Sequence, residues 1–330
     1  MTTAATGSPR LNPEIAVVIP TRGRETRLAF ALEALAVQTV ACERFEVVVV
    51  RDGDAEPPLA GAPPGLRLRE LTRPGVAGPT AKRNLGWRAT EAPLVAFTDD
   101  DCRPQPGWVG AMIGAAPGER GFLQGRTEPD PDELYLLPGL SRTQEVSKPT
   151  GWFEACNVAY PRALLERLGG FDEAFGFGGE DTDLAYRAIE SGASPRFVEG
   201  ARVWHAVIPR GPRGALRDAT RWNDLAAVLA RHPALRRALH HRVFWLPSHE
   251  RWLLALGGAV LATVARRRRR ARALGLAAIL PYLDLHLNWR QPGLRRTPLQ
   301  LAVLAGWALA DGAEIAARLP AAVRRGVFVL

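Results

Sequence analysis

Three carboxylates lie within four positions of the stretch GGEDTDLAYRA, residues 178–188, where a glycine-rich loop leads into a helical pattern. Acidic side chains in a first helical turn are stabilised by the helix dipole and by unpaired N–H groups, yet a single capping carboxylate meets that need. Glu180, Asp181 and Asp183 therefore indicate that a ligand is bound or deprotonated at this helix. The alternative is an N-capped helix that carries surplus acid on its surface.

A second acidic cluster lies in TDDDCRP, residues 98–104, directly after an apolar run. Asp99 and Asp101 are two positions apart, and their carboxylate oxygens are ligands that suit Mg²⁺ or Mn²⁺ rather than zinc or copper. Such cations commonly bridge a few protein oxygens to a phosphate group. The alternative is a solvated loop that caps the helix near Trp108.

Further polar residues with possible chemistry are scattered singly or in pairs along the chain. Asp52 could accept a hydrogen bond from a nucleobase or a ribose hydroxyl, or it could form an Asx turn with the following glycine. Lys82 and Arg83 could neutralise a diphosphate, or they could occupy an exposed helix face. A lone histidine is more often structural than a ligand, and only the carboxylates make His205 a candidate third metal ligand.

The elements that position these residues follow an α/β rhythm. Apolar runs predict strands at 15–20, 45–52, 66–71 and 94–101, and helical spacing predicts helices at 24–39 and 78–90. This alternation predicts a parallel sheet covered by helices on both faces, in which ligands bind beyond the carboxyl ends of the strands. The polar clusters at 21–22, 52–54 and 99–101 fall at those ends, so we expect them to converge on one edge.

After about residue 120 predicted strands and helices no longer alternate regularly. A strand, a helix and a turn are expected over 151–172, and 203–207 is expected to be a short strand that holds His205. From about residue 215 the chain becomes helical and rich in Ala, Leu and Arg. We therefore predict three parts, which are a flexible N-terminus (1–13), an α/β catalytic domain (14–212) and a basic helical region (213–330).

A site for a metal ion and a diphosphate at this edge suggests a chemical role for the carboxylates of residues 178–188. If a metal-bound diphosphate leaves from one side, an acceptor hydroxyl must lose its proton on the other, and Asp181 is our candidate base. Glu180 and Asp183 would hold acceptor hydroxyls or cap the helix. Gly178 and Gly179 would let the backbone and a substrate approach closely.

Composition limits the class of protein and its partners. The 330 residues are 47% hydrophobic, which excludes wholesale disorder, and the net charge of +9 favours anionic partners. Three cysteines without a C-x-x-C pair fit a reducing, cytosolic setting rather than a disulfide framework or a zinc site. The first residues carry no apolar run, so we expect no signal peptide.

The last third of the chain holds apolar stretches at 252–265, 273–287 and 299–319. Each falls short of the roughly 18–20 clean apolar residues that a membrane span needs. Their tryptophans and the arginine run Arg266–Arg270 favour helices that lie in an anionic membrane interface. The alternatives are a soluble helical subdomain packed on the catalytic domain and a dimer interface.

Together these motifs resemble the family 2 glycosyltransferases, inverting enzymes that use nucleotide-sugars on the GT-A fold. The likeness covers about residues 14–208 and is carried by IPTRGR (19–24), VVVVRDGD (47–54), GPTAKRNLG (78–86), FTDDDCRP (97–104) and GGFDEAFGFGGEDTDLAYR (169–187). The last segment also resembles the Gly-Gly-Glu-Asp region of β-1,4-galactosyltransferases. The chain departs from the family at Arg51, where the second strand usually ends Asp-Asp-Gly-Ser.

The resemblance implies a Rossmann-like GT-A fold, with a mostly parallel sheet, helices on both faces and an added α-helical C-terminal region. It implies Asp181 as the base and Mn²⁺ or Mg²⁺ as the cofactor, held by Asp99, Asp101 and His205. The donor nucleotide would contact Pro20, Thr21, Arg24, Asp52, Lys82, Arg83, Asp99 and Asp100. The acceptor would contact Trp152, Gly178, Gly179, Glu180 and Asp183.

The expected activity is a hexosyltransferase-like single displacement from a nucleotide-sugar to a hydroxyl of a glycan or lipid-linked acceptor. The expected location is the cytoplasmic face of a membrane, with an anionic membrane surface as partner and no nucleic acid. A nucleotidyltransferase that makes a nucleotide-sugar is an alternative, although it would normally carry a glycine-rich phosphate loop after the first strand. A non-catalytic anion-binding protein is another, although the converging aspartates would repel a polyanion.

Overall fold

The computed structural model describes residues 12–53, 63–75, 77–137, 140–175, 178–219, 224–287 and 298–330. The chain divides into two compact units, one of Met1–Asp132 with Thr143–Ala206 and one of Glu133–Arg142 with Val207–Leu330. Most of the N-terminus predicted as flexible and Asp54 of the second polar cluster lie outside the described residues. The domain boundary at residue 212 stays a prediction.

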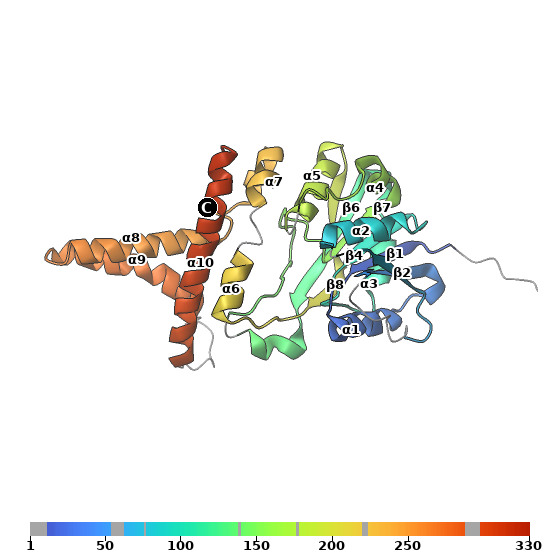
Figure 1. Cartoon of the computed structure of the whole chain (residues 1–330), viewed down its shortest axis with the longest axis horizontal. Coiled ribbons are helices and arrows are strands. Elements are labelled where there is room, and N and C mark those ends of the chain that lie inside the picture. Colours follow the sequence, from blue (N-terminus) through green and yellow to red (C-terminus); the bar gives the residue numbers. More distant parts are fainter. Residues whose placement is uncertain are drawn as a thin grey trace, which may run out of the picture. The chain divides into compact units, whose positions relative to one another are not determined.

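The first unit is built on an eight-stranded mixed sheet of order β3-β2-β1-β4-β7-β6-β8-β5. Figure 1 draws this sheet together with the helices of the unit. Strands β3, β2, β1 and β4 run parallel, β7 is antiparallel to β4 and β6, β8 is parallel to β6, and β5 is antiparallel to β8. The strands are β1 (Ile15–Pro20), β2 (Phe45–Asp52), β3 (Leu68–Arg73), β4 (Leu94–Thr98), β5 (Cys102–Pro104), β6 (Gly121–Pro129), β7 (Asn157–Pro161) and β8 (Ser194–His205). The predicted α/β class is confirmed.

Helices cover both faces of this sheet, as expected for buried parallel strands. The helices of the first unit are α1 (Glu25–Ala36), α2 (Pro79–Arg88), α3 (Trp108–Gly114), α4 (Arg162–Leu168) and α5 (Glu180–Glu190), with short 3₁₀ turns at Cys42–Arg44 and Gly118–Arg120. In β1, Ile15, Val17 and Ile19 share a core cluster with the apolar face of α1. Because strand side chains alternate, Val18 points to the opposite face, where α2 lies.

The parallel strands place the predicted polar clusters along one edge. Strands β1, β2 and β4 end at Pro20, Asp52 and Thr98, and their register is parallel, so the residues that follow share the carboxyl edge of the sheet. The pairing of β5 with β8 sets Cys102 opposite His205 and brings that histidine beside the acidic turn. This edge is therefore where the candidate site is built.

Two predicted strand lengths differ from the structure. The strand predicted at 94–101 ends at Thr98, because its three aspartates form a turn in which Cys102 N–H donates to the carbonyl of Asp99. The short strand predicted at 203–207 is the end of the twelve-residue β8. Charged and small residues on the exposed part of β8 hide the apolar alternation by which a strand is recognised.

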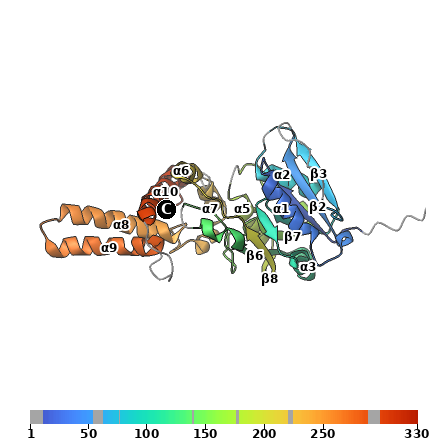
Figure 2. The same cartoon turned by 90° about the horizontal axis from the view of Figure 1, so that it is seen from below.

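The second unit is helical, as predicted for the C-terminal part of the chain. Its helices are α6 (Pro212–Ala219), α7 (Leu225–Arg231), α8 (Pro247–Val264), α9 (Arg269–Leu287) and α10 (Pro298–Arg324), with a 3₁₀ turn at Pro233–Ala238. A further 3₁₀ turn, Pro131–Leu136, spans the change from the first unit to the second. Helices α8 and α9 lie side by side as a hairpin (Figures 1 and 2). Within the described residues, every helix is too short or too polar to cross a membrane.

The packing of α2 on the sheet depends on Gly86. A Cβ atom at this position would lie 2.4 Å from Cγ1 of Val18 and 3.2 Å from Cγ2 of Val50, so only glycine lets the helix approach this closely. We predict that Gly86→Ala lowers the free energy of unfolding by about 1–3 kcal/mol, the usual cost of overpacking a core.

The matched control for this prediction is Gly114→Ala. Gly114 is the last residue of α3, and a Cβ atom there would meet no heavy atom within 4 Å. Denaturant unfolding of both variants measures the difference. Equal stability of the two variants would contradict the packing argument.

Candidate active site

Asp52, at the carboxyl end of β2, is held by residues that precede and begin α2. Lys82 Nζ lies 2.8 Å from Asp52 Oδ1, and the Ala77 N–H donates to the same oxygen at 3.1 Å. Burial would raise the pKa of Asp52, but the hydrogen bonds from Lys82 and Ala77 and the lysine charge outweigh it and hold the pKa below its usual value. Lys82 also donates to the carbonyl of Thr21 at 2.6 Å, so it ties β2 to the loop after β1.

A cavity of about 160 Å³ lies beside this pair, lined by Pro20, Thr21, Arg22, Arg24, Ala77, Gly78, Pro79 and Lys82. Asp52 Oδ2 is buried and accepts no hydrogen bond from the described residues, and Arg22 Nε is 3.5 Å away. The side chains of Arg22 and Arg24 are 64% and 42% exposed. The cavity is thus lined by two partly exposed arginines that pair with carboxylates, and Asp52 lies behind Arg22 and Lys82.

Arg24 connects the loop after β1 to the acidic turn after β4. Its guanidinium lies 2.6 Å from Asp100 Oδ1 and also pairs with Asp101. Thr21 Oγ1 donates to Asp100 Oδ2 at 2.6 Å. Burial, together with the charges of Asp101 and Asp99, raises the pKa of Asp100 to about 7 despite the opposing effect of Arg24. Asp100 is therefore an internal anchor of the turn.

Asp101 and His205 form the part of the site that fits a divalent cation. Oδ1 of Asp101 lies 3.7 Å from Nε2 of His205, and Nδ1 of the histidine lies 2.8 Å from the carbonyl oxygen of Ala206. A carbonyl only accepts, so Nδ1 carries a proton, and Nε2 is the nitrogen that a metal would bind beside Asp101. A carboxylate oxygen and an imidazole nitrogen suit Mn²⁺ or Mg²⁺ with further ligands from phosphate or water.

Cys102 is the third potential ligand at this place and was not expected from the sequence. Its Sγ lies within 4.8 Å of the ligand atoms of Asp101 and His205. Burial raises the pKa of the Cys102 thiol, which keeps it neutral and a poor ligand for a hard cation. Asp99, predicted as a metal ligand, lies outside this group.

Asp99 instead belongs to an ion bridge centred on Arg83. The guanidinium of Arg83 lies 2.7 Å from Asp99 Oδ1 and 2.9 Å from Glu180 Oε1. Burial would lower the pKa of Arg83, but the charges of Asp99 and Glu180 outweigh it and raise the pKa above its usual value. Lys82 and Arg83, predicted to neutralise a diphosphate, are both buried and engaged with carboxylates of the protein.

The start of α5 presents Asp181 as the least committed carboxylate of the predicted base segment. Gly178 and Gly179 have φ values of 96° and 95°, which only glycine adopts readily, and they let the Gly178 N–H donate to Glu180 Oε2 at 2.9 Å. Asp181 accepts from the N–H groups of Thr182 at 2.8 Å and Ala155 at 3.1 Å. Burial and the charge of Glu180 raise the pKa of Asp181 to about 8, against the effect of Arg83.

The segment 150–155 packs against the start of α5. The carbonyl of Trp152 accepts from Thr182 Oγ1 at 2.7 Å, and Phe153 has a left-handed φ of 56°, which is uncommon for a bulky residue. This backbone aims the N–H of Ala155 at Asp181 and sets Trp152 beside the same helix turn. Sequence analysis predicted Trp152 as an acceptor contact but not the conformation of Phe153, because that conformation depends on tertiary contacts.

Glu154, in the same segment, is a second carboxylate that sequence analysis did not single out. Its Oε2 accepts from Gln124 Nε2 at 2.8 Å and from Thr150 Oγ1 at 3.4 Å. Burial raises the pKa of Glu154, and its charge contributes to the raised pKa of Asp181. The two carboxylates therefore influence each other electrostatically.

Asp183 and Arg51 both form ion pairs that connect elements of the fold. Asp183 is fully buried and pairs with Arg187 at 2.8 Å, and Arg187 also donates to the carbonyls of Leu168 and Gly170, so this carboxylate anchors α5 to the end of α4. Arg51, the departure from the family pattern, is buried and pairs with Glu70 of β3 at 2.8 Å. It stabilises the sheet edge beside Asp52.

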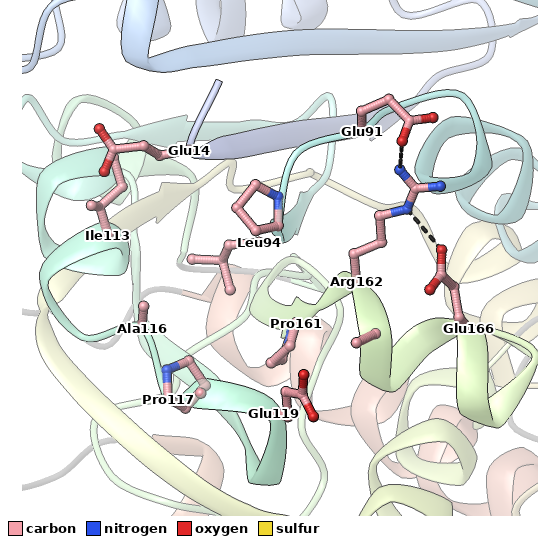
Figure 3. A pocket seen from close by; sticks show the side chains of 13 residues that line it. Glu14, Glu91, Leu94, Ile113, Ala116, Pro117, Glu119, Pro161, Arg162 and Glu166 are labelled. Carbon is pink, nitrogen blue, oxygen red and sulfur yellow. Dashed lines mark hydrogen bonds and ion pairs between the residues drawn. The ribbon is translucent and has the colours of Figure 1, made fainter. Parts of the chain in front are cut away.

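A larger cavity of about 630 Å³ lies elsewhere in the first unit (Figure 3). Leu94 and Pro161 line it at the start of β4 and the end of the antiparallel β7, so it opens at the amino ends of the parallel strands. Arg162 bridges Glu91 and Glu166 at its wall (Figure 3). None of the predicted site residues lines it.

Comparison with known proteins shows which family the first unit is similar to. Residues 16–167 match the model of the family described as glycosyl transferase family 2. The chain is 32% identical over 215 residues to validoxylamine A glucosyltransferase of Streptomyces hygroscopicus subsp. limoneus, covering 53% of this chain and 48% of that protein. It is 29% identical over 323 residues to pre-mycofactocin glycosyltransferase of Mycobacterium tuberculosis (strain CDC 1551 / Oshkosh), covering 88% of this chain and 63% of that protein. The chain thus spans only about half to two thirds of these relatives.

Solved structures share the fold. A mannosyltransferase from Pyrobaculum calidifontis in complex with GDP-Man and Mn²⁺ has a TM-score of 0.60 at 22% identity, covering 92% of this chain and 87% of that one. Residues 1–349 of S. aureus TarS in complex with UDP-GlcNAc have a TM-score of 0.54 at 16% identity, covering 95% and 92%. The chain therefore has the GT-A fold, and its residues 16–167 are similar to glycosyl transferase family 2.

Proposed function

We propose that the chain is an inverting glycosyltransferase that moves a sugar from a nucleoside-diphosphate sugar to an acceptor hydroxyl. The observation that carries this proposal is the placement of Asp181. It is a partly buried carboxylate with a raised pKa, joined through Glu180, Arg83 and Asp99 to the acidic turn at the carboxyl edge of the sheet. The candidate base would thereby keep a fixed position relative to the candidate sites for the diphosphate and the metal ion.

The donor nucleotide would bind in the cavity at Pro20 and Thr21, next to Asp52. Oδ2 of Asp52 accepts no hydrogen bond from the described residues and is suited to accept from a base edge or a ribose hydroxyl, because the depressed pKa of Asp52 keeps it ionised. The accessible guanidinium groups of Arg22 and Arg24 would meet the diphosphate. The GDP-Man and UDP-GlcNAc in the structural neighbours support this class of donor without choosing the base.

A divalent cation would be held by Asp101 and His205. Mn²⁺ is our first choice, since the mannosyltransferase neighbour was solved with it and the imidazole ligand suits it better than Mg²⁺. Bound there, the cation would supply charge to stabilise the leaving diphosphate. We retain Asp99 as a donor contact rather than a metal ligand, because Arg83 already holds its carboxylate.

The acceptor would lie between Trp152 and the glycines of the α5 loop. Asp181 would take the proton of the attacking hydroxyl, which approaches the anomeric carbon on the face opposite the diphosphate. The N–H groups of Ala155 and Thr182 hold the carboxylate in position for this transfer. Attack from the opposite face inverts the anomeric configuration, and no covalent sugar intermediate is needed.

The α8–α9 hairpin would bind an anionic membrane surface at the cytoplasmic face and so bring the enzyme to a lipid-linked acceptor. The hairpin exposes a set of large apolar side chains, which are Leu254, Leu256, Val260, Leu261, Val264, Leu274, Leu276 and Leu280. Inside the hairpin, Gly258 and Gly275 pack backbone against backbone, since a Cβ on either would lie 2.5 Å from the other's carbonyl oxygen. The exposed arginines at 266–270 lie in the turn between the two helices and in the first two positions of α9, where they would meet anionic headgroups.

The first test of catalysis is Asp181→Asn. We expect this substitution to lower the transfer rate by about 10²–10⁴-fold, the usual contribution of a general base, while donor binding stays within about twofold. The assay follows release of nucleoside diphosphate from UDP-, GDP- and dTDP-sugars in the presence of glycan and lipid-linked acceptors. Glu190→Gln, an exposed carboxylate at the end of α5, is the matched control and should keep full activity. Full transfer by the Asp181→Asn enzyme would exclude this residue as the base.

The second test uses the pH dependence of transfer. Only the ionised form of Asp181 accepts a proton, so the rate should rise with pH through about 8, the value to which its surroundings raise the pKa. Glu180→Gln removes a neighbouring negative charge that raises this pKa, and the profile should therefore shift toward lower pH. A profile that is unmoved in the variant, with donor saturating, would contradict the assigned electrostatics.

The membrane proposal is tested by sedimentation with vesicles that contain phosphatidylserine. Replacing Arg266, Arg267 and Arg268 with serine should weaken binding by roughly 100-fold, at about 1 kcal/mol for each arginine near the surface. Replacing Arg213, Arg237 and Arg325, which are exposed elsewhere in the second unit, is the control with equal charge loss. Equal weakening by both triple variants would mean that net charge, and not the hairpin, governs binding.

A further inference from the structure

The second unit carries a cluster of metal-binding side chains that the proposed transfer reaction does not use. We propose that His240, His241 and Glu250 form a Zn²⁺ site. Their ligand atoms, two imidazole nitrogens and one carboxylate oxygen, all lie within 4.8 Å of one another. The site is separate in chemistry from the Asp101–His205 pair, because two imidazoles make it suited to zinc rather than to a hard cation.

Both imidazoles face the same carboxylate oxygen. Nε2 of His240 lies 2.7 Å from Oε2 of Glu250, and Nε2 of His241 lies 3.6 Å from it. Zinc–ligand bonds of about 2.0–2.2 Å in a tetrahedral site separate the ligand atoms by roughly 3.3–3.5 Å. Small side-chain movements, mainly a widening between His240 and Glu250, therefore bring three ligands to zinc distance.

The backbone of the turn is what brings adjacent histidines together. His241 and Arg242 have φ values of 49° and 61°, and Val243 N–H donates to the carbonyl of His240 at 3.1 Å, which makes a tight turn with two left-handed residues. This conformation costs free energy for residues other than glycine, and such strain persists where the surroundings enforce it. It sets the two imidazole rings with centroids 4.1 Å apart.

Glu250 is supplied by the first turn of α8, so a metal would join the turn to that helix. The turn also pairs with the end of the chain, through Trp245 N–H to the carbonyl of Leu330 at 2.8 Å and Leu330 N–H to that of Val243 at 3.0 Å. His241 is 65% exposed, which leaves room for water or another ligand at a fourth position. Zinc bound here would stabilise the part of the helical unit where these segments meet.

The experiment titrates the full chain with Zn²⁺ and, as a spectroscopic probe, with Co²⁺. The background is Asp101→Ala/His205→Ala, which removes the other candidate metal site. We expect one equivalent to bind, a visible Co²⁺ spectrum typical of nitrogen and oxygen ligands, and a zinc-dependent rise in the unfolding temperature. Each of these should be lost or weakened at least about tenfold by Glu250→Gln or His240→Ala, since either change removes a direct ligand.

Asp284→Asn, an exposed carboxylate of α9, is the control that should leave binding unchanged. Glu250→Gln keeps a hydrogen-bond partner for His240, so a folded variant is expected, and circular dichroism checks it. Absence of binding to the folded background protein at micromolar zinc would overturn the proposal. So would binding that His240→Ala and Glu250→Gln leave unchanged.

Discussion

The site depends on the ion bridge that Arg83 makes with Asp99 and Glu180. These two carboxylates come from the turn after β4 and from the start of α5, which are far apart in the sequence. A buried guanidinium without its partners would be strongly destabilising, so the bridge fixes the two elements against each other. Asp181 follows Glu180 directly, and its position relative to the acidic turn is thereby set by one arginine.

Helix α2 makes this bridge possible because its two adjacent cationic side chains, Lys82 and Arg83, pair with carboxylates of different elements. Lys82 turns toward Asp52 and the carbonyl of Thr21, while Arg83 turns toward the acidic turn and α5. Gly86, one turn later, lets the helix sit directly on Val18 and Val50. The close approach of the helix and the reach of its two cations are therefore parts of one arrangement.

The same arrangement shifts the pKa values of two carboxylates of the site in opposite directions. Asp52 has a lysine and a backbone N–H on one oxygen and a depressed pKa, whereas Asp181 lies near Glu180 and Glu154 and has a raised one. One carboxylate thus stays ionised for binding while another is suited to exchange a proton near neutral pH, a division of roles typical of acid–base sites.

Sequence patterns predicted the strands of the parallel half and the edge on which the polar clusters meet, because buried parallel strands are continuous apolar runs and end in polar turns. They did not predict the partners of Lys82 and Arg83, which appear as an ordinary basic pair on a helix and are in fact buried. Phe153, Glu154 and Cys102 were missed for the same reason. Their significance lies in contacts between distant segments, which leave no local periodicity or spacing.

The most direct measurement of the central claim is calorimetric titration of the purified chain with UDP, GDP and dTDP, with and without Mn²⁺, in parallel with Asp101→Ala. The account predicts that one nucleotide binds tightly only with Mn²⁺ and that the variant loses at least about tenfold in affinity. Folded protein that binds none of the three, or binding that is indifferent to both Mn²⁺ and Asp101, would contradict the assignment of this edge as a nucleotide-sugar site.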